Sequence, residues 1–299
     1  MKFLNIFTEL KHRIVLLFCL VLVQFSYAQS DSEKVIPKLK FSVGTELMTS
    51  KVQLNNSSLE NPSGFGFGVN LGISYRLNTK FSLFSGLGFN RYKSKITLDS
   101  YSSFENSVDM SGEDFEFRYE VQNFSEEQNY SAISIPIAIQ YETTGNFRFY
   151  SKVGFEANFF VSQKYESKAE KLTTTGYFPR INAELTQPTF AGFGSFENQK
   201  FISNDFKVKN SFNATLEAGV KQILKSGNSL YVGVFTKLGL NTLSSDMKSG
   251  LVSYNSEEAT AFLSTSILQA IDRQRSSSNQ FAQAKLRVFG IAFRYEFSL

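Results

Sequence analysis

Residues 64–77 read Gly-Phe-Gly-Phe-Gly-Val-Asn-Leu-Gly-Ile-Ser-Tyr-Arg-Leu, and this stretch decides the fold class. Every second side chain from Phe65 to Leu77 is aliphatic or aromatic, whereas those between them are Gly, Asn, Ser or Arg. Successive side chains of a β-strand point to opposite faces, so the pattern predicts a strand with one apolar and one polar face. The glycines on the polar face indicate that this face looks into a narrow space.

The same alternation recurs along the chain and predicts seven further strands. They cover 38–47, 81–90, 132–141, 147–161, 211–221, 230–241 and 289–299. Eight antiparallel strands with one apolar face each can form a soluble sandwich, a lipocalin-like barrel with its apolar face inside, or an outer-membrane barrel with its apolar face towards lipid.

Three features favour the membrane barrel. The stretches exceed the five or six residues of an ordinary strand and suit the ~9–11 residues that cross a bilayer at a tilt. The polar face carries glycines and isolated charges, which fit a narrow interior better than a solvated surface. Aromatic residues that could form interfacial girdles lie near strand ends, namely Phe81, Tyr92, Tyr141, Phe147, Tyr295 and Phe297.

The connections alternate between short and long. Short turns are expected at 78–79, 143–146 and 225–228, and long loops at 49–63, 99–129, 163–208 and 242–283. Strict alternation over eight strands predicts an up-and-down barrel, with both ends of the chain and the short turns on the periplasmic side and the long loops outside. Phe115, Phe117, Tyr119 and Val121 also alternate, but a ninth spanning strand would break the parity. We therefore expect a hairpin extension above the membrane.

The leading segment predicts export. Basic residues in 1–13, an apolar run over 14–23 and the small residues Ser26 and Ala28 form a secretory signal peptide spanning 1–28. The alternative is a membrane anchor, but the run falls short of the roughly 20 residues that a spanning helix needs. The expected organisation is the signal peptide 1–28, a periplasmic segment 29–37 and a barrel domain 38–299. After cleavage near Ala28, the mature barrel is expected to reside in the cell outer membrane.

Composition excludes several function classes. The single Cys19 and the single His12 lie in the signal peptide, so the mature chain lacks thiolate and imidazole chemistry. We expect no cofactor, no metal site and no catalytic residues. Paired carboxylates in the loops, Glu113-Asp114, Glu126-Glu127 and Glu257-Glu258, are expected to be solvated charges rather than an acid–base pair. The formal net charge of +4 is small, and no nucleic-acid partner is expected.

One hairpin resembles a known family. Tyr130-Ser-Ala-Ile-Ser-Ile-Pro136-Ile-Ala-Ile-Gln-Tyr141, a short turn, and Phe149-Tyr-Ser-Lys-Val-Gly154-Phe-Glu-Ala-Asn-Phe are similar to the central hairpin of the PorT-like outer-membrane β-barrel family. The alternation in 289–299 resembles the carboxy-terminal signal read by the barrel-assembly machinery, although it ends on Leu299 rather than an aromatic. The resemblance implies a barrel in outer-membrane lipid and suggests a link to type IX protein secretion.

Charged residues occur on the inward face of the predicted strands. They are Arg76, Arg148, Lys152, Glu156, Glu217, Lys221, Lys237, Arg294 and Glu296. An eight-stranded barrel encloses just enough room for its own side chains, so mutual ion pairs are expected. A narrow ion or proton path is the functional alternative.

The long loops are the candidate interaction sites, because connectors of this length usually fold and act. Loop 163–208 carries Tyr165, Tyr177, Phe178, Phe190, Phe193, Phe196 and Phe201 among polar residues. We take Tyr177, Phe178, Phe190, Phe193 and Phe196 as candidate partner-binding residues. The alternative is that these rings pack into a small core of the loop itself or onto the barrel mouth.

Loop 242–283 predicts an amphipathic helix over about 255–275. Its apolar face would comprise Ala259, Phe262, Leu263, Ile267, Ala270 and Ile271, with Asn255 as the cap and Glu258 three residues on. Such a helix could pack on the barrel, cover its mouth, lie on the membrane surface or dock a partner.

Together these observations predict a non-enzymatic outer-membrane barrel. The leading functional hypothesis is a PorT-like component that docks partners in a type IX-like secretion or envelope machine. The alternatives are a structural anchor or adhesin-like barrel and, more remotely, a narrow channel.

Overall fold

The computed structural model describes residues 38–54, 62–203, 207–245, 249–271 and 283–298. The predicted signal peptide and the segment 29–37 lie outside these ranges. No helix within them is long and apolar enough to cross a bilayer.

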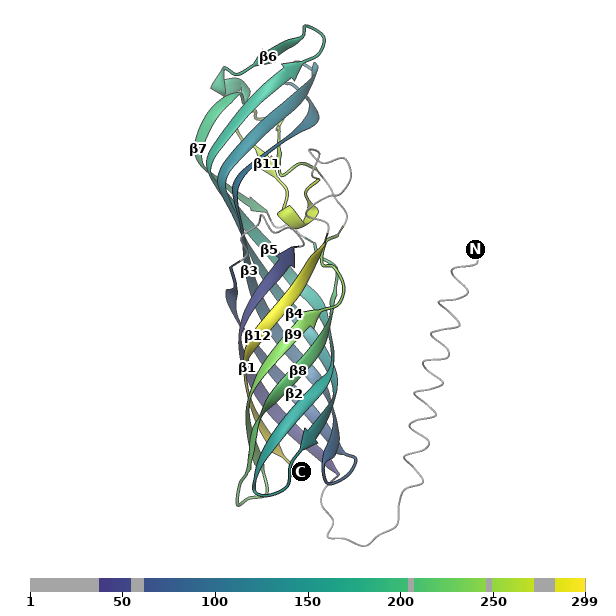
Figure 1. Ribbon diagram of the computed structural model, residues 1–299. Coiled ribbons are helices and arrows are strands. Elements are labelled where there is room, and N and C mark those ends of the chain that lie inside the picture. The colour runs from purple at the N-terminus through teal and green to yellow at the C-terminus, as the bar shows by residue number, and fades with distance from the viewer. Residues whose placement is uncertain (1–37, 55–61, 204–206, 246–248, 272–282, 299) are drawn as a thin grey trace, which may run out of the picture. The chain divides into compact units, whose positions relative to one another are not determined.

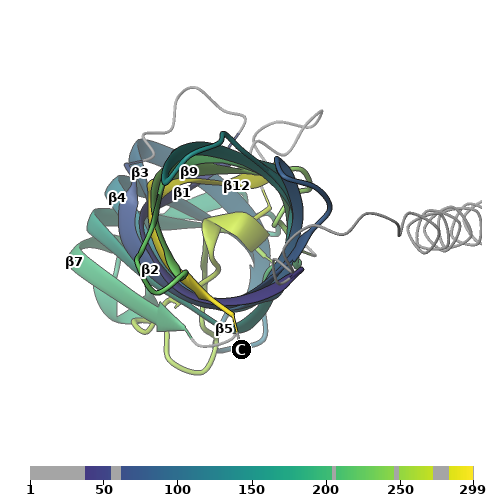
Figure 2. The ribbon, with the colours of Figure 1, turned by 90° about the horizontal axis from the view of Figure 1, so that it is seen from below.

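Eight strands close into one barrel (Figures 1 and 2). Each pairs antiparallel with the next along the chain, and the last pairs with the first, as Phe41 opposite Phe297 and Leu54 opposite Ala284 show. The strands are β1 (Leu39–Leu54), β2 (Gly64–Arg76), β3 (Phe81–Val108), β4 (Asp114–Glu142), β5 (Phe147–Phe178), β8 (Ser211–Ile223), β9 (Ser229–Gly239) and β12 (Ala284–Phe297). The predicted all-β, eight-stranded, up-and-down barrel is confirmed.

The strand β2 shows why the sequence produces this wall. Its apolar residues point outward and stay exposed, with exposed fractions from 41% at Tyr75 to 66% at Leu71. Its glycines point inward, where a Cβ on Gly68 would lie 2.1 Å from Asn90 Oδ1 and one on Gly72 would lie 2.6 Å from the Phe84 ring. The interior therefore has no room for larger side chains on this strand.

An apolar band surrounds the barrel. Lipid-facing side chains on all eight strands are between about a third and two-thirds exposed, including Val43, Leu87, Ile137, Phe155, Leu216, Val234 and Phe289. Charged side chains lie inside. An apolar exterior around a charged interior is the arrangement of a transmembrane β-barrel. Phe81, Tyr141 and Phe147 lie at the ends of the band as predicted, but Tyr92 does not. Its ring is fully buried inside the barrel, because residue 92 falls on the inward face of β3.

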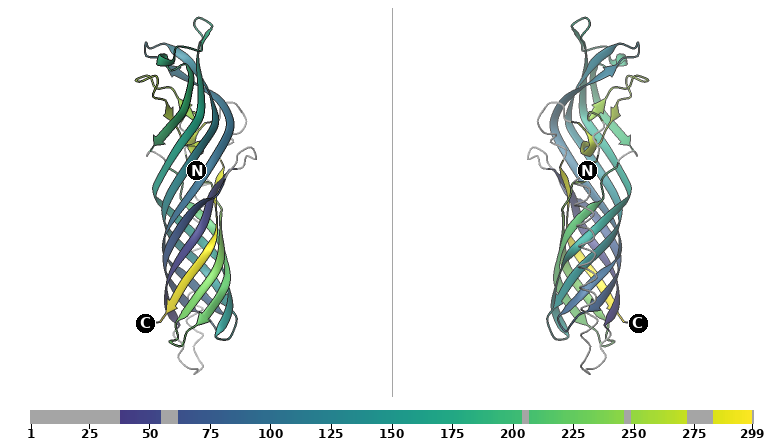
Figure 3. Two further views of the ribbon diagram at one scale, coloured as in Figure 1. Left: turned by 90° about the vertical axis from the view of Figure 1, so that its left-hand side faces the viewer. Right: turned by 90° about the vertical axis from the view of Figure 1, so that its right-hand side faces the viewer.

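Three strands continue far beyond the band on the side of the long loops (Figures 1 and 3). The predicted hairpin extension is confirmed, since β3 and β4 stay paired up to Val108 opposite Asp114. The strand β5 continues beside β4, and two short strands, β6 (Ala183–Leu185) and β7 (Gly194–Ser203), pair with β5. We call residues 93–108, 114–129 and 163–178 with β6 and β7 the sheet extension.

The predicted helix in loop 242–283 is wrong for the residues described. Instead of one α-helix, residues 249–271 form a two-stranded hairpin of β10 (Val252–Ser253) and β11 (Leu263–Ser264), followed by the short 3₁₀ helix η3 (Ile267–Gln269). A second 3₁₀ helix, η2 (Thr189–Ala191), precedes β7. Most of the apolar residues are buried as a helix face would require, but Leu263 is 54% exposed. Contacts with the sheet extension have overridden local periodicity. We call residues 249–271 the covering segment.

Candidate functional site

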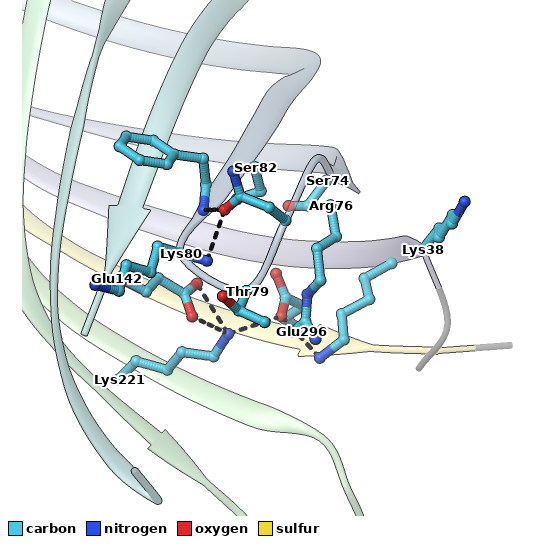
Figure 4. A pocket seen from close by; sticks show the side chains of 12 residues that line it. Lys38, Ser74, Arg76, Thr79, Lys80, Ser82, Glu142, Lys221 and Glu296 are labelled. Carbon is cyan, nitrogen blue, oxygen red and sulfur yellow. Dashed lines mark hydrogen bonds and ion pairs between the residues drawn. The ribbon is translucent and has the colours of Figure 1, made fainter. Parts of the chain in front are cut away.

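Five charged residues form a cluster inside the short-turn end of the barrel. Lys221 is almost fully buried, and its Nζ lies 2.9 Å from both Glu142 carboxylate oxygens and 3.4 Å from Glu296 Oε1. Lys40 pairs with Glu296 at 3.1 Å, and Arg148 pairs with Glu142 at 3.2 Å. Figure 4 shows the Lys221 ammonium joined to both carboxylates. Each carboxylate thus has two cationic partners, which offsets the cost of burying it.

Arg294 occupies the next layer of the interior. Its guanidinium lies 4.0 Å from the centroid of the Tyr231 ring and 5.0 Å from that of Phe84. Its Nη2 donates a hydrogen bond to Gln140 Oε1. The Tyr231 hydroxyl lies within hydrogen-bond distance of Glu142 and Glu296. Cation–π contacts and hydrogen bonds therefore connect this layer to the lower cluster.

The third layer holds two further ion-pair groups. Lys237 Nζ lies 2.7 Å from Glu46 Oε2 and 2.9 Å from Glu156 Oε2. Lys152 pairs with Glu217 at 2.5 Å. Together the three layers contain all the predicted interior charges except Arg76, which lies at the mouth of the short-turn end.

The interior is filled by these side chains. The cavity bordered by Glu46, Lys152, Glu156 and Lys237 measures about 50 Å³, and the pocket at the short-turn end measures about 20 Å³. A water molecule needs about 10–15 Å³, so the larger space holds a few waters and the smaller one about one or two. The geometry favours a packed structural interior over an ion path.

At one height of the sheet extension, the inward-facing positions of β3, β4 and β5 switch between even-numbered and odd-numbered residues. Asp99, Asn123 and Glu170 lie side by side on β3, β4 and β5, and each adds one outward residue to its strand. Asn123 adopts a left-handed φ of 48°, and its side chain donates to Glu170 Oε2 at 2.6 Å. Odd-numbered residues of β4 face lipid in the barrel, but beyond this phase break odd-numbered residues face inward. Asn adopts a left-handed φ more readily than most residues do, so an Asn within the alternating stretch is the sequence feature that could have located the break.

The phase break places the aromatic residues of the extension on its inner face. Phe115 stacks on Phe178 at 5.2 Å between ring centroids and meets Tyr254 of the covering segment edge-on at 5.0 Å. Phe117 stacks on Phe262 at 6.1 Å. These contacts join the inner face of the sheet and the covering segment into one apolar core.

The five candidate partner-binding residues occupy different environments. Phe178 and Phe193 are buried in this core, and Phe196 packs against it. Tyr177 lies on the outer face beneath the Arg118 guanidinium, 4.7 Å from the ring centroid. Phe190 is 79% exposed. Of the set, Phe190 is therefore the aromatic side chain most available to a partner.

Glu126 holds the covering segment in place. Its carboxylate is fully buried and accepts hydrogen bonds from Ser266 Oγ at 2.6 Å and from the Ile267 amide at 2.9 Å. Gln128 and Ser167 donate to it from the sheet side. Burial raises the pKa of Glu126, although these donors favour the charged form. Sequence reasoning treated Glu126 as a solvated loop charge, because its burial depends on a segment more than a hundred residues away.

Two tyrosines make further contacts with the covering segment. The Tyr119 hydroxyl accepts from the Leu251 amide at 2.9 Å, and burial raises the pKa of Tyr119 to about 12. Tyr165 donates to the Ser264 carbonyl at 2.9 Å. Viewed along the barrel axis in Figure 2, the yellow-green covering segment lies across the ring of strands. The segment thus covers the long-loop mouth of the barrel, one of the arrangements considered for this loop.

The loop carboxylates Glu126 and Glu127 do not form a joint site. Glu126 and Glu127 are neighbours on one strand and point to opposite faces, one buried and one exposed. Across the ranges described above, no group of three or more His, Cys, Asp or Glu side chains is placed to hold a metal ion.

No protein-family model and no curated protein sequence matches the chain. Similar solved structures include Neisserial surface protein A (10% identity, TM-score 0.33, covering 87% of this chain and 97% of that one). Another is Ail of Yersinia pestis in complex with the heparin analogue sucrose octasulfate (10% identity, TM-score 0.33, covering 87% of this chain and 99% of that one). A third is the outer membrane protein OprG from Pseudomonas aeruginosa (9% identity, TM-score 0.32, covering 87% of this chain and 95% of that one). With scores this low, the assignment of the fold rests on the strand pairing itself.

Proposed function

We propose that this chain is a non-enzymatic outer-membrane barrel whose sheet extension docks a partner protein outside the cell. In this proposal residues 1–28 direct export, the barrel-assembly machinery inserts the strands, and the short turns face the periplasm. The resemblance of the hairpin over 130–159 to the PorT-like family supports a role in a type IX-like secretion or envelope machine.

The observation that carries the proposal is an apolar distal tip. Val108, Met110, Ile181, Leu185 and Phe190 lie in or beside the connections at the end of the extension farthest from the membrane band, where β3 pairs last with β4 and β6 pairs with the end of β5. Their exposed fractions run from 39% to 79%. Elsewhere the outer face of the extension is largely polar or charged. Exposed apolar residues gathered beyond a polar stem are typical of an interaction site.

The tip is also held in a defined shape. Arg180 on the β5–β6 turn makes two hydrogen bonds to the Glu113 carboxylate beside the β3–β4 turn, at 2.7 and 3.1 Å. This contact joins the two turns that carry Met110 and Ile181. A preformed surface loses less conformational entropy on binding than a mobile loop does.

The test replaces the tip without disturbing the core. We expect the triple variant Met110→Ser, Ile181→Ser, Phe190→Ser to keep the electrophoretic shift between unheated and boiled samples, which reports a folded barrel. Co-purification of envelope proteins from mild detergent and the amount of secreted protein in the medium should both fall at least tenfold.

Leu263→Ser is the matched control, because Leu263 is 54% exposed outside the tip. Deleting 163–208 is a coarser test, since it removes the strands on which the covering segment packs. If the triple variant behaves like the wild type in both assays, the docking role is refuted. A folded barrel that is always recovered alone would favour the anchor or adhesin-like alternative.

A further inference from the structure

An excess of positive charge surrounds the short-turn mouth of the barrel. The pocket shown in Figure 4 is lined by five cationic side chains, Lys38, Lys40, Arg76, Lys80 and Lys221, and by two carboxylates, Glu142 and Glu296. Both carboxylates are already paired with Lys40, Lys221 or Arg148. Among the residues that the structure places, Lys38, Arg76 and Lys80 have no carboxylate partner, so their charge is available to an anion.

This mouth lies at the level of a membrane interface. Phe81 and Tyr141 pair there with ring centroids 5.3 Å apart, and Phe41 and Phe297 do so at 6.4 Å. Aromatic residues concentrate where hydrocarbon meets headgroups. The unpartnered cations are therefore at the depth of lipid phosphates.

An apolar groove of about 440 Å³ runs along the lipid-facing surface of the same strands. Phe41, Val43, Leu71, Ile73, Leu87 and Phe297 form its walls. Its floor is the row Ser42, Gly72 and Gly86, which are register partners across β1, β2 and β3. Because these residues have small side chains that point inward, the outer surface between the apolar walls is bare backbone.

The cationic pocket and the groove are close along the strands. Lys40 and Ser74 of the pocket are register partners, and Ser42 and Gly72 of the groove are the pair two residues further on, about 7 Å away. Lys40 and Ser74 face the interior and the groove lies on the outside, so the two surfaces meet at the rim formed by the end of β2 and the β2–β3 turn. One amphipathic molecule can contact both over this rim, with an anionic head at the mouth and a hydrocarbon chain on the outer barrel wall.

We propose that this rim binds an anionic phospholipid of the inner leaflet. The phosphate contacts Arg76, Lys80 and Lys38, and one acyl chain lies in the groove over β1, β2, β3 and β12. The inference rests on the proposed outer-membrane location. Charge complementarity selects an anionic head, and the apolar groove selects a lipid over a free anion.

Native mass spectrometry of the refolded mature protein tests this. With equal amounts of phosphatidylglycerol and phosphatidylcholine of the same chains, we expect phosphatidylglycerol to be retained at least tenfold more. The variant Lys38→Gln, Arg76→Gln, Lys80→Gln should lose that preference. The matched control Lys164→Gln, Lys168→Gln, Lys171→Gln removes the same charge from the sheet extension and should keep it.

A second variant tests the groove separately. Val43→Trp fills the groove and should weaken retention of long-chain phosphatidylglycerol severalfold, while leaving the dihexanoyl form unchanged. Val234→Trp, at a lipid-facing position of similar exposure on β9, is its control.

Equal retention of the two lipids, or an equal effect of the two charge triples, would overturn the proposal. Complete displacement of phosphatidylglycerol by inorganic phosphate would replace it with a small-anion site. The electrophoretic heat shift is read in parallel. A protein that shows the shift in vesicles but no lipid preference refutes the lipid site alone, whereas a protein that does not insert refutes the membrane location.

Discussion

Removing Lys237 should destabilise the barrel more than removing any single exposed charge. The Lys237 side chain is 3% exposed, and it is the cation within ion-pair distance of both Glu46 and Glu156, whose side chains are 16% and 6% exposed. Lys237→Met keeps the length of the side chain but leaves two carboxylates facing one cavity without that partner. Breaking a buried ion pair by removing one member costs about 3–5 kcal/mol.

A compensating triple variant distinguishes unpaired charge from simple loss of packing as the cause of the lost stability. In the triple variant Lys237→Met, Glu46→Gln, Glu156→Gln, the unpaired negative charges are gone, so most of the lost stability should return. The measurement is urea unfolding in lipid vesicles, followed by the electrophoretic heat shift. A loss below about 1 kcal/mol for Lys237→Met, typical of an exposed pair, would refute the reasoning. Failure of the two Gln substitutions to restore stability would refute it as well.

Two further predictions concern the sheet extension. Asn123→Val should destabilise the extension by about 1–2 kcal/mol, because a β-branched residue disfavours a φ of 48°, whereas the stability of Asn123→Gly should stay near that of the wild type. Hydrogen exchange of residues 115–121 measures this, and equal protection in both variants would contradict it. The pKa of Glu126 is raised in the folded protein, so the folded state favours the protonated carboxyl. The free energy by which Glu126 holds the covering segment is therefore complete below the unfolded pKa of about 4.3 and is lost as pH rises through the folded pKa. Opening at Ile267, measured by hydrogen exchange corrected for intrinsic rates, should therefore increase from pH 5 to pH 8 in the wild type, and a matching rise in Glu126→Gln would count against this assignment.

The fold followed from local pattern because a lipid-facing strand must alternate over its whole length. The single stretch 64–77 already shows the two-residue period, the glycine face and the apolar face of a barrel strand. Seven similar stretches supply the other strands that close the barrel. The residues that point inward could be named for the same reason. Which of them pair could not, since Lys237 and Glu46 are 191 positions apart and meet only when the barrel closes.

The extension shows where local pattern stops being sufficient. The alternation of Phe115, Phe117, Tyr119 and Val121 identified a hairpin, but a phase break at Asn123 decides which face those rings occupy. The periodicity of residues 259–271 suits a helix, yet the inner face of the sheet and the Glu126 carboxylate select a hairpin and a 3₁₀ turn. Sequence alone determined which residues had to leave water or face lipid, because that depends on side-chain chemistry and strand period. Tertiary structure decided the partners, because burial of Glu126 and exposure of Phe190 depend on segments brought together only by folding.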